Sequence, residues 1–148
     1  MYETLSRGKR TDNGEWIEGY HVPLGDKLHY ILTGKLTIIK LVPTFEHFPV
    51  DPKTIGQYTG LTDRNGKKIF VGDIIDNDWC FIYRPSVVML GEYTQPNDDI
   101  HTKHIGFFVK HTGTRKDYYR KDLGYYAGKC EVLGNIHDNP ELLGGDPA

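Results

Sequence analysis

Short stretches in which apolar and polar residues alternate, separated by turn-forming residues, make up most of this chain. Residues 5–10 and 16–22 are two such stretches, and they flank an Asn13-Gly14 pair. Asn-Gly tolerates the positive φ angles that tight hairpin turns require, and alternation with period two is typical of a strand with one buried face. These residues therefore predict an N-terminal β-hairpin.

The same combination recurs in the middle of the chain. Asn65-Gly66 precedes an apolar run, residues 69–75, that contains Gly72 and Asp73. Gly72 permits a bulge or a close approach of the backbone, and the Asp73 carboxylate can accept hydrogen bonds from nearby backbone amides. We interpret Asp73 as a residue that locks a turn, and the run as a strand of a second β module.

Two further stretches, residues 28–32 and 36–42, are expected to pair with each other across a turn at Thr33-Gly34. The second stretch is apolar at positions of both parities, which is typical of a strand covered on both faces. We therefore expect this strand to lie where two layers or two modules meet.

The remaining strands are predicted at residues 79–90, 105–110 and 130–136. Pro85 lies inside the first of them and predicts an edge position or a bulge, because proline has no amide hydrogen to donate. Residues 112–128 suit either a loop or a short helix. Asn139 before Pro140 predicts a brief terminal turn of helix with Asn139 as its cap.

Together these elements predict a mainly β protein, with an N-terminal β-hairpin module, a small β-barrel or sandwich and a short C-terminal helical turn. The best candidate boundary is a cluster of three prolines, Pro43, Pro49 and Pro52. We therefore expect a β module over residues 1–53, a second domain over residues 54–143 and a frayed tail over residues 144–148.

The composition fits a small folded protein and excludes few functions. The 148 residues include 17 Gly, 8 Pro and 10 Tyr, and the formal net charge is -2. Such a chain has no global field that would steer it to DNA, so nucleic-acid binding would need a local basic face. Because no apolar run approaches twenty residues and no secretory segment is recognisable, we expect a cytoplasmic protein without a membrane partner.

Residues that suggest a metal or catalytic site are few. His101, His104 and His111 lie close in sequence, but no Cys or carboxylate completes a ligand set, so they are interpreted as solvated loop histidines. Cys80 and Cys130 lie among strand-forming residues and are interpreted as buried, reduced thiols, while their pairing stays open. No catalytic triad spacing and no phosphate-binding glycine spacing can be identified. We therefore expect no metal, no cofactor, no small-molecule substrate and no enzymatic activity.

The most informative chemical feature is a basic and aromatic segment between residues 110 and 126. Its candidate binding residues are Lys110, Arg115, Lys116, Tyr118, Tyr119, Arg120 and Lys121. Cationic tracks with stacking rings are typical of proteins that bind single-stranded nucleic acid, and small barrels often present both on one face. Tyrosine-rich patches also form protein interfaces, and Asp117 and Asp122 interrupt the positive charge. A nucleic-acid surface, a protein contact and a solvated loop all stay open.

Several motifs are long enough to carry a family resemblance. They are Arg7-Gly8-Lys9, Asp12 to Trp16, Gly19-Tyr20, Asp51 to Leu61, Asp63 to Phe70, Gly72 to Ile75 and Gly134 to Leu143. In this combination the chain resembles the YopX family, small proteins carried by phages and prophages. The resemblance implies a β-rich N-terminal part and a C-terminal SH3-type barrel, in the cytoplasm of the bacterial host. It implies no catalytic residues, because the family has no established activity.

The leading functional hypothesis is a non-enzymatic interaction module that binds a protein partner or a second copy of itself. It depends on the abundance of tyrosines and turn glycines in a chain without a catalytic constellation. The alternative is a small barrel protein that binds single-stranded nucleic acid through the segment from Lys110 to Tyr126.

Overall fold

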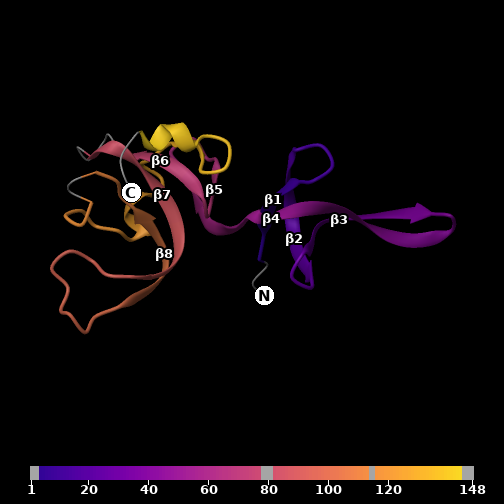
Figure 1. Ribbon diagram of the computed structural model, residues 1–148, viewed down its shortest axis with the longest axis horizontal. Helices are drawn as coiled ribbons and strands as arrows, with labels where there is room; N and C mark the ends of the chain where they lie inside the picture. The colour runs from indigo at the N-terminus through magenta and orange to yellow at the C-terminus, as the bar shows by residue number, and fades with distance from the viewer. Residues whose placement is uncertain (1–3, 78–81, 114–115, 145–148) are drawn as a thin grey trace. The chain divides into compact units, whose positions relative to one another are not determined.

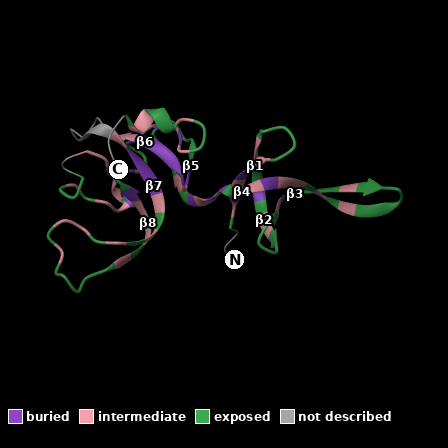
Figure 2. Cartoon of the chain, viewed as in Figure 1, coloured by how far each residue is buried: buried purple, intermediate pink, exposed green. Residues whose placement is uncertain are grey.

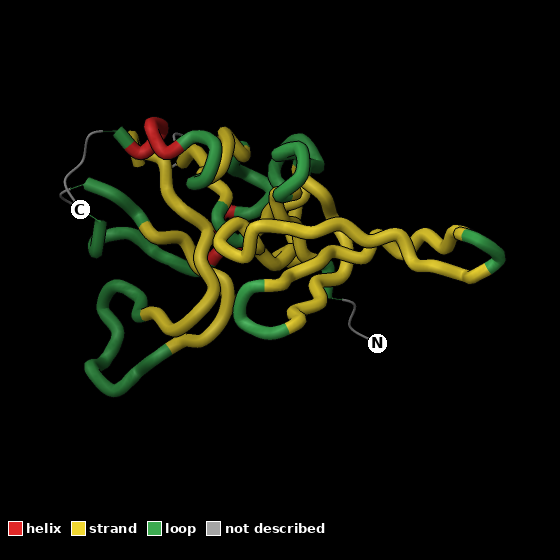
Figure 3. Tube along the Cα trace, turned by 45° about the vertical axis from the view of Figure 1, so that its right-hand side comes forward, coloured by secondary structure: helices red, strands yellow, loops and turns green. Residues whose placement is uncertain are grey.

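The computed structural model describes residues 4–77, 82–113 and 116–144, and most of these residues lie in strands (Figure 1). The strands are β1 (Ser6–Arg10), β2 (Trp16–Leu24), β3 (Leu28–Ile39), β4 (Val42–Thr62), β5 (Lys68–Phe70), β6 (Asp73–Asn77), β7 (Ile82–Tyr93), β8 (His104–Lys110) and β9 (Val132–Asn135). Within the described ranges, helical structure is confined to short segments, α1 (Leu123–Tyr126) and the 3₁₀ turn η2 (Pro140–Leu143) (Figure 3). The protein is therefore mainly β, as predicted.

The chain forms two compact units, residues 1–58 and 59–148, and β4 runs through the division between them. No helix in the described part of the chain is long and apolar enough to cross a bilayer.

The predicted N-terminal hairpin is confirmed in unit 1. β1 and β2 pair antiparallel, with Lys9 opposite Trp16. At the turn, Gly14 has a φ of 74°, and the Asn13 side chain accepts a hydrogen bond from the Glu15 amide at 2.9 Å. The Asn-Gly pair therefore shapes the turn as its conformational preferences predict.

The predicted turn at Thr33-Gly34 is wrong. β3 passes straight through these residues, and Gly34, with a φ of 87°, lies where the register between β3 and β4 shifts. The chain reverses later, at Lys40 and Leu41, whose φ angles are 50° and 68°. Two consecutive positive φ angles match a type I′ turn, which usually contains Asn or Gly. Gly34 therefore lies at a bulge, and the actual turn at Lys40 and Leu41 contains none of the residues that usually mark a turn in a sequence.

The core of unit 1 is small. Ile31 and Val50 are its buried apolar side chains among the described residues, with 0% and 2% exposure. Glycines allow the strands to approach closely around them. A Cβ atom at Gly8 would lie 3.0 Å from the Val50 Cβ, and one at Gly19 would collide with the Leu32 carbonyl oxygen. Figure 2 shows the buried class in only a small part of this unit.

Unit 2 contains an antiparallel sheet in the order β8-β7-β6-β9 and a larger core. The core cluster consists of Ile69, Ile75, Val88, Val109, Leu123, Tyr126, Cys130 and Val132. Seven of these residues lie in β5, β6, β7, β8, α1 and β9, and Cys130 lies just before β9. Leu61, at the end of β4, packs against the cluster, so one apolar cluster connects these described elements of the unit.

Two buried carboxylates lock turns in unit 2. Asp63 accepts hydrogen bonds from the amides of Asn65, Lys67 and Val132 at 2.9, 2.9 and 3.0 Å. Burial alone would raise the pKa of Asp63, but these donors outweigh it and hold the pKa below its ordinary value. Asp73, 1% exposed, accepts a hydrogen bond from the Phe70 amide at 2.8 Å, which confirms its predicted structural role.

The bulge or edge position at Pro85 and the helical turn at the C-terminus were further local predictions. Pro85 lies in a bulge of β7, between the pairs Ser86–Ile75 and Ile82–Asn77. The helical turn at the C-terminus is confirmed as η2, and Asn139 occupies its N-cap position, as predicted, but its side chain forms no capping hydrogen bond. The Asn139 side chain accepts a hydrogen bond from the Asn135 amide instead. A short Asn side chain can form hydrogen bonds with several nearby backbone groups, and here the Asn135 amide takes the place of a capping amide.

Cys130 is buried, as predicted, and burial raises the pKa of its thiol to about 11. A thiol with such a pKa is protonated at neutral pH and is a poor nucleophile. Cys80 lies outside the described residues, as does the tail after Gly144.

Candidate functional site

The basic and aromatic segment runs from the end of β8 through a loop into α1. The loop returns to β8 at Lys121 and Asp122. The Val109 amide donates to the Lys121 carbonyl oxygen at 2.8 Å, and Phe108 forms an isolated bridge with Asp122. The cations near both ends of the segment are therefore held by the backbone of one strand.

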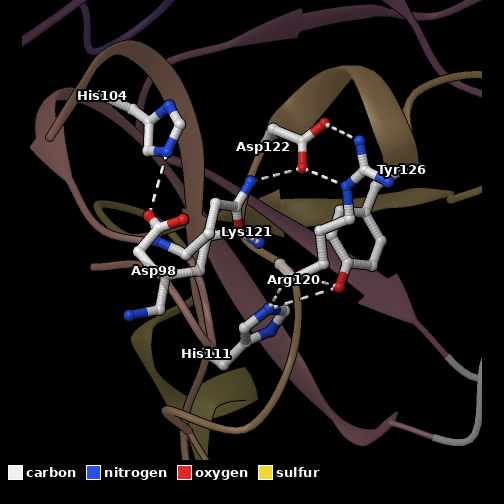
Figure 4. A network of polar contacts seen from close by, with 8 residues as sticks. Asp98, His104, His111, Arg120, Lys121, Asp122 and Tyr126 are labelled. Atoms are coloured by element: carbon white, nitrogen blue, oxygen red, sulfur yellow. Dashed lines mark hydrogen bonds and ion pairs between the residues drawn. The ribbon is translucent and has the colours of Figure 1, made fainter. Parts of the chain in front are cut away.

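His111 anchors this loop from inside unit 2, and its interpretation as a solvated histidine is wrong, because it is only 3% exposed. Its Nε2 lies 2.9 Å from the Arg120 carbonyl oxygen (Figure 4), and its Nδ1 lies 2.7 Å from Ser86 Oγ. A carbonyl oxygen can only accept, so Nε2 carries the hydrogen and Nδ1 accepts from Ser86. The Tyr126 hydroxyl donates to the same carbonyl at 2.6 Å. Burial lowers the pKa of His111, which keeps the ring neutral.

The Gln95 side chain also holds the loop before α1, through hydrogen bonds to Lys121 and Asp122. Its side-chain amide donates to the Asp122 carboxylate at 2.7 Å, and its side-chain oxygen accepts from the Lys121 amide at 2.7 Å. Arg120 donates to the same carboxylate (Figure 4). The Arg120 guanidinium also lies over the Tyr125 ring, 4.8 Å from its centroid. Burial alone would raise the pKa of Asp122, but the hydrogen bonds from Arg120 and Gln95 hold it below its ordinary value.

Asp98 and His104 form a second set of contacts beside Gln95. The Asp98 carboxylate accepts a hydrogen bond from the Gln95 backbone amide at 2.6 Å and lies 3.0 Å from His104 Nε2. Tyr93 stacks between His104 and Phe108, with ring centroids 5.2 and 4.9 Å apart. The loop after β7 and the loop before α1 are therefore both fixed to the sheet through side chains.

These segments enclose a pocket of about 530 Å³. Its apolar wall includes Met89, Tyr93 and Phe108. Three of the predicted binding residues, Lys110, Lys116 and Lys121, line it from different parts of the segment. Ligand pockets are commonly of this size and lining, mostly apolar with a few convergent polar groups.

The other described candidates, Tyr118, Tyr119 and Arg120, do not line this pocket. Arg120 is neutralised by Asp122, and Tyr119 packs edge-on against His111 with centroids 5.8 Å apart. Tyr118 is 75% exposed and contacts Tyr119 edge-on. Arg115 lies outside the described residues. The binding role of the segment stays a prediction, and the sequence did not indicate which of its cations line the pocket.

A second exposed feature lies in unit 1, at the far end of the β3–β4 hairpin. We call residues 36–45 the arm. Its large apolar side chains are exposed: Leu36 56%, Ile38 73%, Ile39 55%, Leu41 94%, Val42 59% and Phe45 59%. The sequence pattern had shown apolar residues at both parities and predicted burial between layers. In the described structure these side chains face solvent.

Cross-strand pairing divides the arm into two faces. Leu36 lies opposite Phe45 and Ile38 opposite Pro43, and directly opposed residues share a face of a sheet. We call these four residues the apolar face. The other face alternates with it and carries Thr37 opposite Thr44 and Ile39 opposite Val42. The two faces therefore differ in polarity, with hydroxyl groups on the second only.

The structure brings together one pair of residues that resembles a catalytic arrangement. Ser86 and His111 are within hydrogen-bond distance, and the Arg120 carbonyl orients the ring as a third group would in a triad. Ser86 is 0% exposed, however, so its hydroxyl cannot reach a substrate. We interpret the pair as structural. Among the described residues, no group of His, Cys, Asp and Glu has a metal-binding arrangement.

The fold defines a mainly β protein of two units, one with a pocket and one with an exposed arm. The family model described as YopX protein matches residues 7–144. Because this match covers nearly the whole chain, the chain belongs to the YopX family. None of the curated proteins matches it.

Proposed function

We propose that this YopX-family chain is a non-enzymatic interaction module, and that the arm of unit 1 is its contact surface. The observation that carries the proposal is the exposure of six large apolar side chains within ten residues. Contiguous apolar surface of this kind marks interaction sites in folded proteins, whereas single exposed apolar residues do not.

The backbone of the arm supports the same proposal. β2 pairs with β3 only from Leu28 to Leu32, so in the described ladders residues 36–39 and 42–45 pair only with each other. A two-stranded ribbon is marginally stable by itself, and its open edges can add a further strand. Burying the apolar face would supply the stabilisation that the small core of unit 1 does not.

The occupant that fits the apolar face best is a second copy of this chain. The face carries Leu36, Ile38, Pro43 and Phe45 and no charged residue. In a two-fold contact each residue near the axis meets its own equivalent, so charge on such a face would repel itself. A charge-free face avoids this repulsion and offers nothing to a strongly charged partner.

The test compares two double variants, each of which places threonine at two apolar positions of one face. Ile38→Thr with Phe45→Thr alters the apolar face, and Ile39→Thr with Val42→Thr alters the opposite face. Sedimentation velocity of the full chain should show a concentration-dependent dimer for the wild type and the second variant, and a monomer for the first. A wild type that stays monomeric at every concentration, or equal loss in both variants, would contradict the proposal.

Finer features of the molecule belong to this proposal as well. We propose that unit 2 is an SH3-type barrel, since one core cluster receives side chains from strands β5 to β9. We also propose a phage or prophage origin and a cytoplasmic location in the bacterial host, both of which the family resemblance supports. Complete backbone assignment by NMR would test the barrel through hydrogen bonds that close the sheet.

A second candidate function is binding of single-stranded nucleic acid by unit 2. The observation that favours it is the convergence of Lys110, Lys116 and Lys121 on one pocket, with the exposed Tyr118 in the same loop. Fluorescence anisotropy with labelled oligonucleotides should show binding at low salt that weakens steeply as salt is added. No binding at low salt would exclude this candidate.

A further inference from the structure

We propose that the pocket of unit 2 is a site for one nucleotide that carries a terminal phosphate, with the lysines holding the phosphate and the aromatic wall holding the base. If the ligand is the end of a nucleic-acid strand, the proposal rests on the second candidate function. It does not depend on the arm. It assigns the pocket a ligand class that can be tested with small molecules alone.

The charge of the pocket is the first argument. Lys110 and Lys116 form no ion pair with a described carboxylate, while Lys121 lies 3.6 Å from Asp117. The other carboxylate of the lining, Glu92, is paired with Lys103 at 2.9 Å. Two positive charges thus face the pocket without a paired counter-charge among the described side chains. A phosphate monoester carries a charge of about -1.5 to -2 at neutral pH, whereas a phosphodiester carries about -1. A terminal phosphate therefore matches the pocket better than an internal one.

The strand geometry is the second argument. Phe108 and Lys110 are two residues apart on β8, so their side chains project from the same face, about 7 Å apart along the strand. Met89 lies directly opposite Phe108 on β7 and shares this face. One strand thus presents a flat apolar surface and a cation at a separation that a sugar can bridge.

The rigidity of the walls is the third argument. Tyr93 stacks against Phe108, and Lys121 is held by its backbone to both Gln95 and Val109. A site whose groups are fixed before binding loses less entropy when the ligand enters. The volume of about 530 Å³ lies within the range of about 300–1,000 Å³ found for small-ligand sites, and it suits one nucleotide rather than a longer segment.

The experiment measures binding to the full chain by isothermal titration calorimetry. The probes are adenosine 5′-monophosphate, adenosine, inorganic phosphate and phenyl phosphate. We expect the nucleotide to bind at least about tenfold more tightly than each of the others, because only it engages both halves of the pocket. Phenyl phosphate binding as tightly as the nucleotide would indicate a site for phosphorylated aromatic side chains and would overturn the proposal. Inorganic phosphate binding as tightly would do the same.

Matched variants locate the site. Lys110→Gln with Lys116→Gln should weaken binding of the nucleotide by at least about tenfold. The control, Lys27→Gln with Lys67→Gln, makes the same change in charge at exposed lysines outside the pocket and should leave binding unchanged. Equal loss in both variants would mean that only the net charge matters, which would contradict a built site. Circular dichroism of each variant would verify that the fold is intact.

Two oligonucleotides distinguish the sources of the phosphate. A single strand with a 5′-phosphate that binds more tightly than the same strand with a 5′-hydroxyl would identify a strand end as the ligand. Binding of the mononucleotide without binding of either strand would identify a free nucleotide, and the second candidate function would then fail while the pocket assignment stands. Absence of binding for the mononucleotide and both strands would overturn the proposal.

Discussion

The two units of this chain differ in how much apolar side chain they bury. Unit 2 joins its elements through a cluster of eight buried residues, whereas unit 1 buries Ile31 and Val50 and exposes most of the apolar side chains of its arm. Apolar burial is the main favourable term in folding, so strand pairing alone leaves unit 1 the weaker of the two. The apolar residues of unit 2 therefore form its own core, while those of the arm are available to bind another molecule.

The contrast predicts very different costs for the same substitution in the two units. Ile75→Ala removes a fully buried side chain from the core cluster and should lower the free energy of unfolding of unit 2 by about 2–5 kcal/mol. Ile38→Ala, at a position 73% exposed in the single chain, should change stability by no more than about 0.5 kcal/mol when measured at a concentration where the chain is monomeric. Urea unfolding followed by hydrogen exchange would assign each effect to its unit. Similar costs at both positions would show that the arm is packed.

The two Asn-Gly turns provide the next comparison. The turn of unit 2 depends on the buried Asp63, and Asp63→Ala would leave three amides without their acceptor, at a cost of about 1–3 kcal/mol. The turn of unit 1 has the exposed Asp12, which pairs with Arg10 at 2.7 Å, and Asp12→Ala should have little effect. Thermal unfolding of the two variants measures the difference.

The pH dependence of this turn follows from the same hydrogen bonds. Because the folded pKa of Asp63 lies below its ordinary value, its stabilisation is present above that value and is lost as the pH falls below about 4. The Asp63→Asn variant should lose this part of the acid sensitivity. An unchanged acid transition would contradict the role given to the carboxylate.

The buried His111 predicts a smaller loss at milder pH. Its pKa is lowered in the fold, so the unfolded chain takes up the proton first, and stability falls as the pH drops below the ordinary value of about 6.5. Each pH unit between the two pKa values removes up to about 1.4 kcal/mol. Unfolding at pH 7 and pH 5 should show a loss in unit 2 that His111→Gln lacks. A loss of the same size in the variant would place its origin elsewhere.

The features that sequence predicted correctly depend on local backbone chemistry. Asn13-Gly14, Gly72-Asp73 and Pro85 each act within a few residues of themselves, so their roles are visible in the chain. The framework that holds the candidate site could not be predicted, because it is formed by residues distant in sequence. Ser86 and His111 are 25 residues apart, and Gln95 and Asp122 are 27 apart. No local pattern marks such pairs.

The arm was misread for a different physical reason. Apolar residues at both parities of residues 36–42 indicate surface that avoids water, but the pattern is the same whether that surface is covered by this chain or by another. The missing turn signal at Lys40 and Leu41 made the error larger, because Gly34 offered the nearest residue that tolerates a positive φ. Composition alone could not distinguish a bulge from a reversal.

That turn gives the smallest predicted effect and the sharpest test of the contrast between the units. Lys40→Asn with Leu41→Gly would place the residues preferred in a type I′ turn at φ angles of 50° and 68°, which should stabilise the arm by about 0.5–1 kcal/mol. Hydrogen exchange of residues 36–45 would report this as slower exchange. The substitution also removes the Leu41 side chain, which is 94% exposed. Lys40→Asn alone separates the two effects, because it improves the turn and keeps Leu41.

If the arm serves only the fold of unit 1, both variants should exchange more slowly and nothing else should change. If it binds another copy through its apolar face, as we propose, dimerisation should survive in both, because Leu41 lies in the turn and outside that face. Faster exchange in the double variant would instead show that Leu41 packs against unit 1, and the contrast between a self-sufficient unit and an open arm would fail.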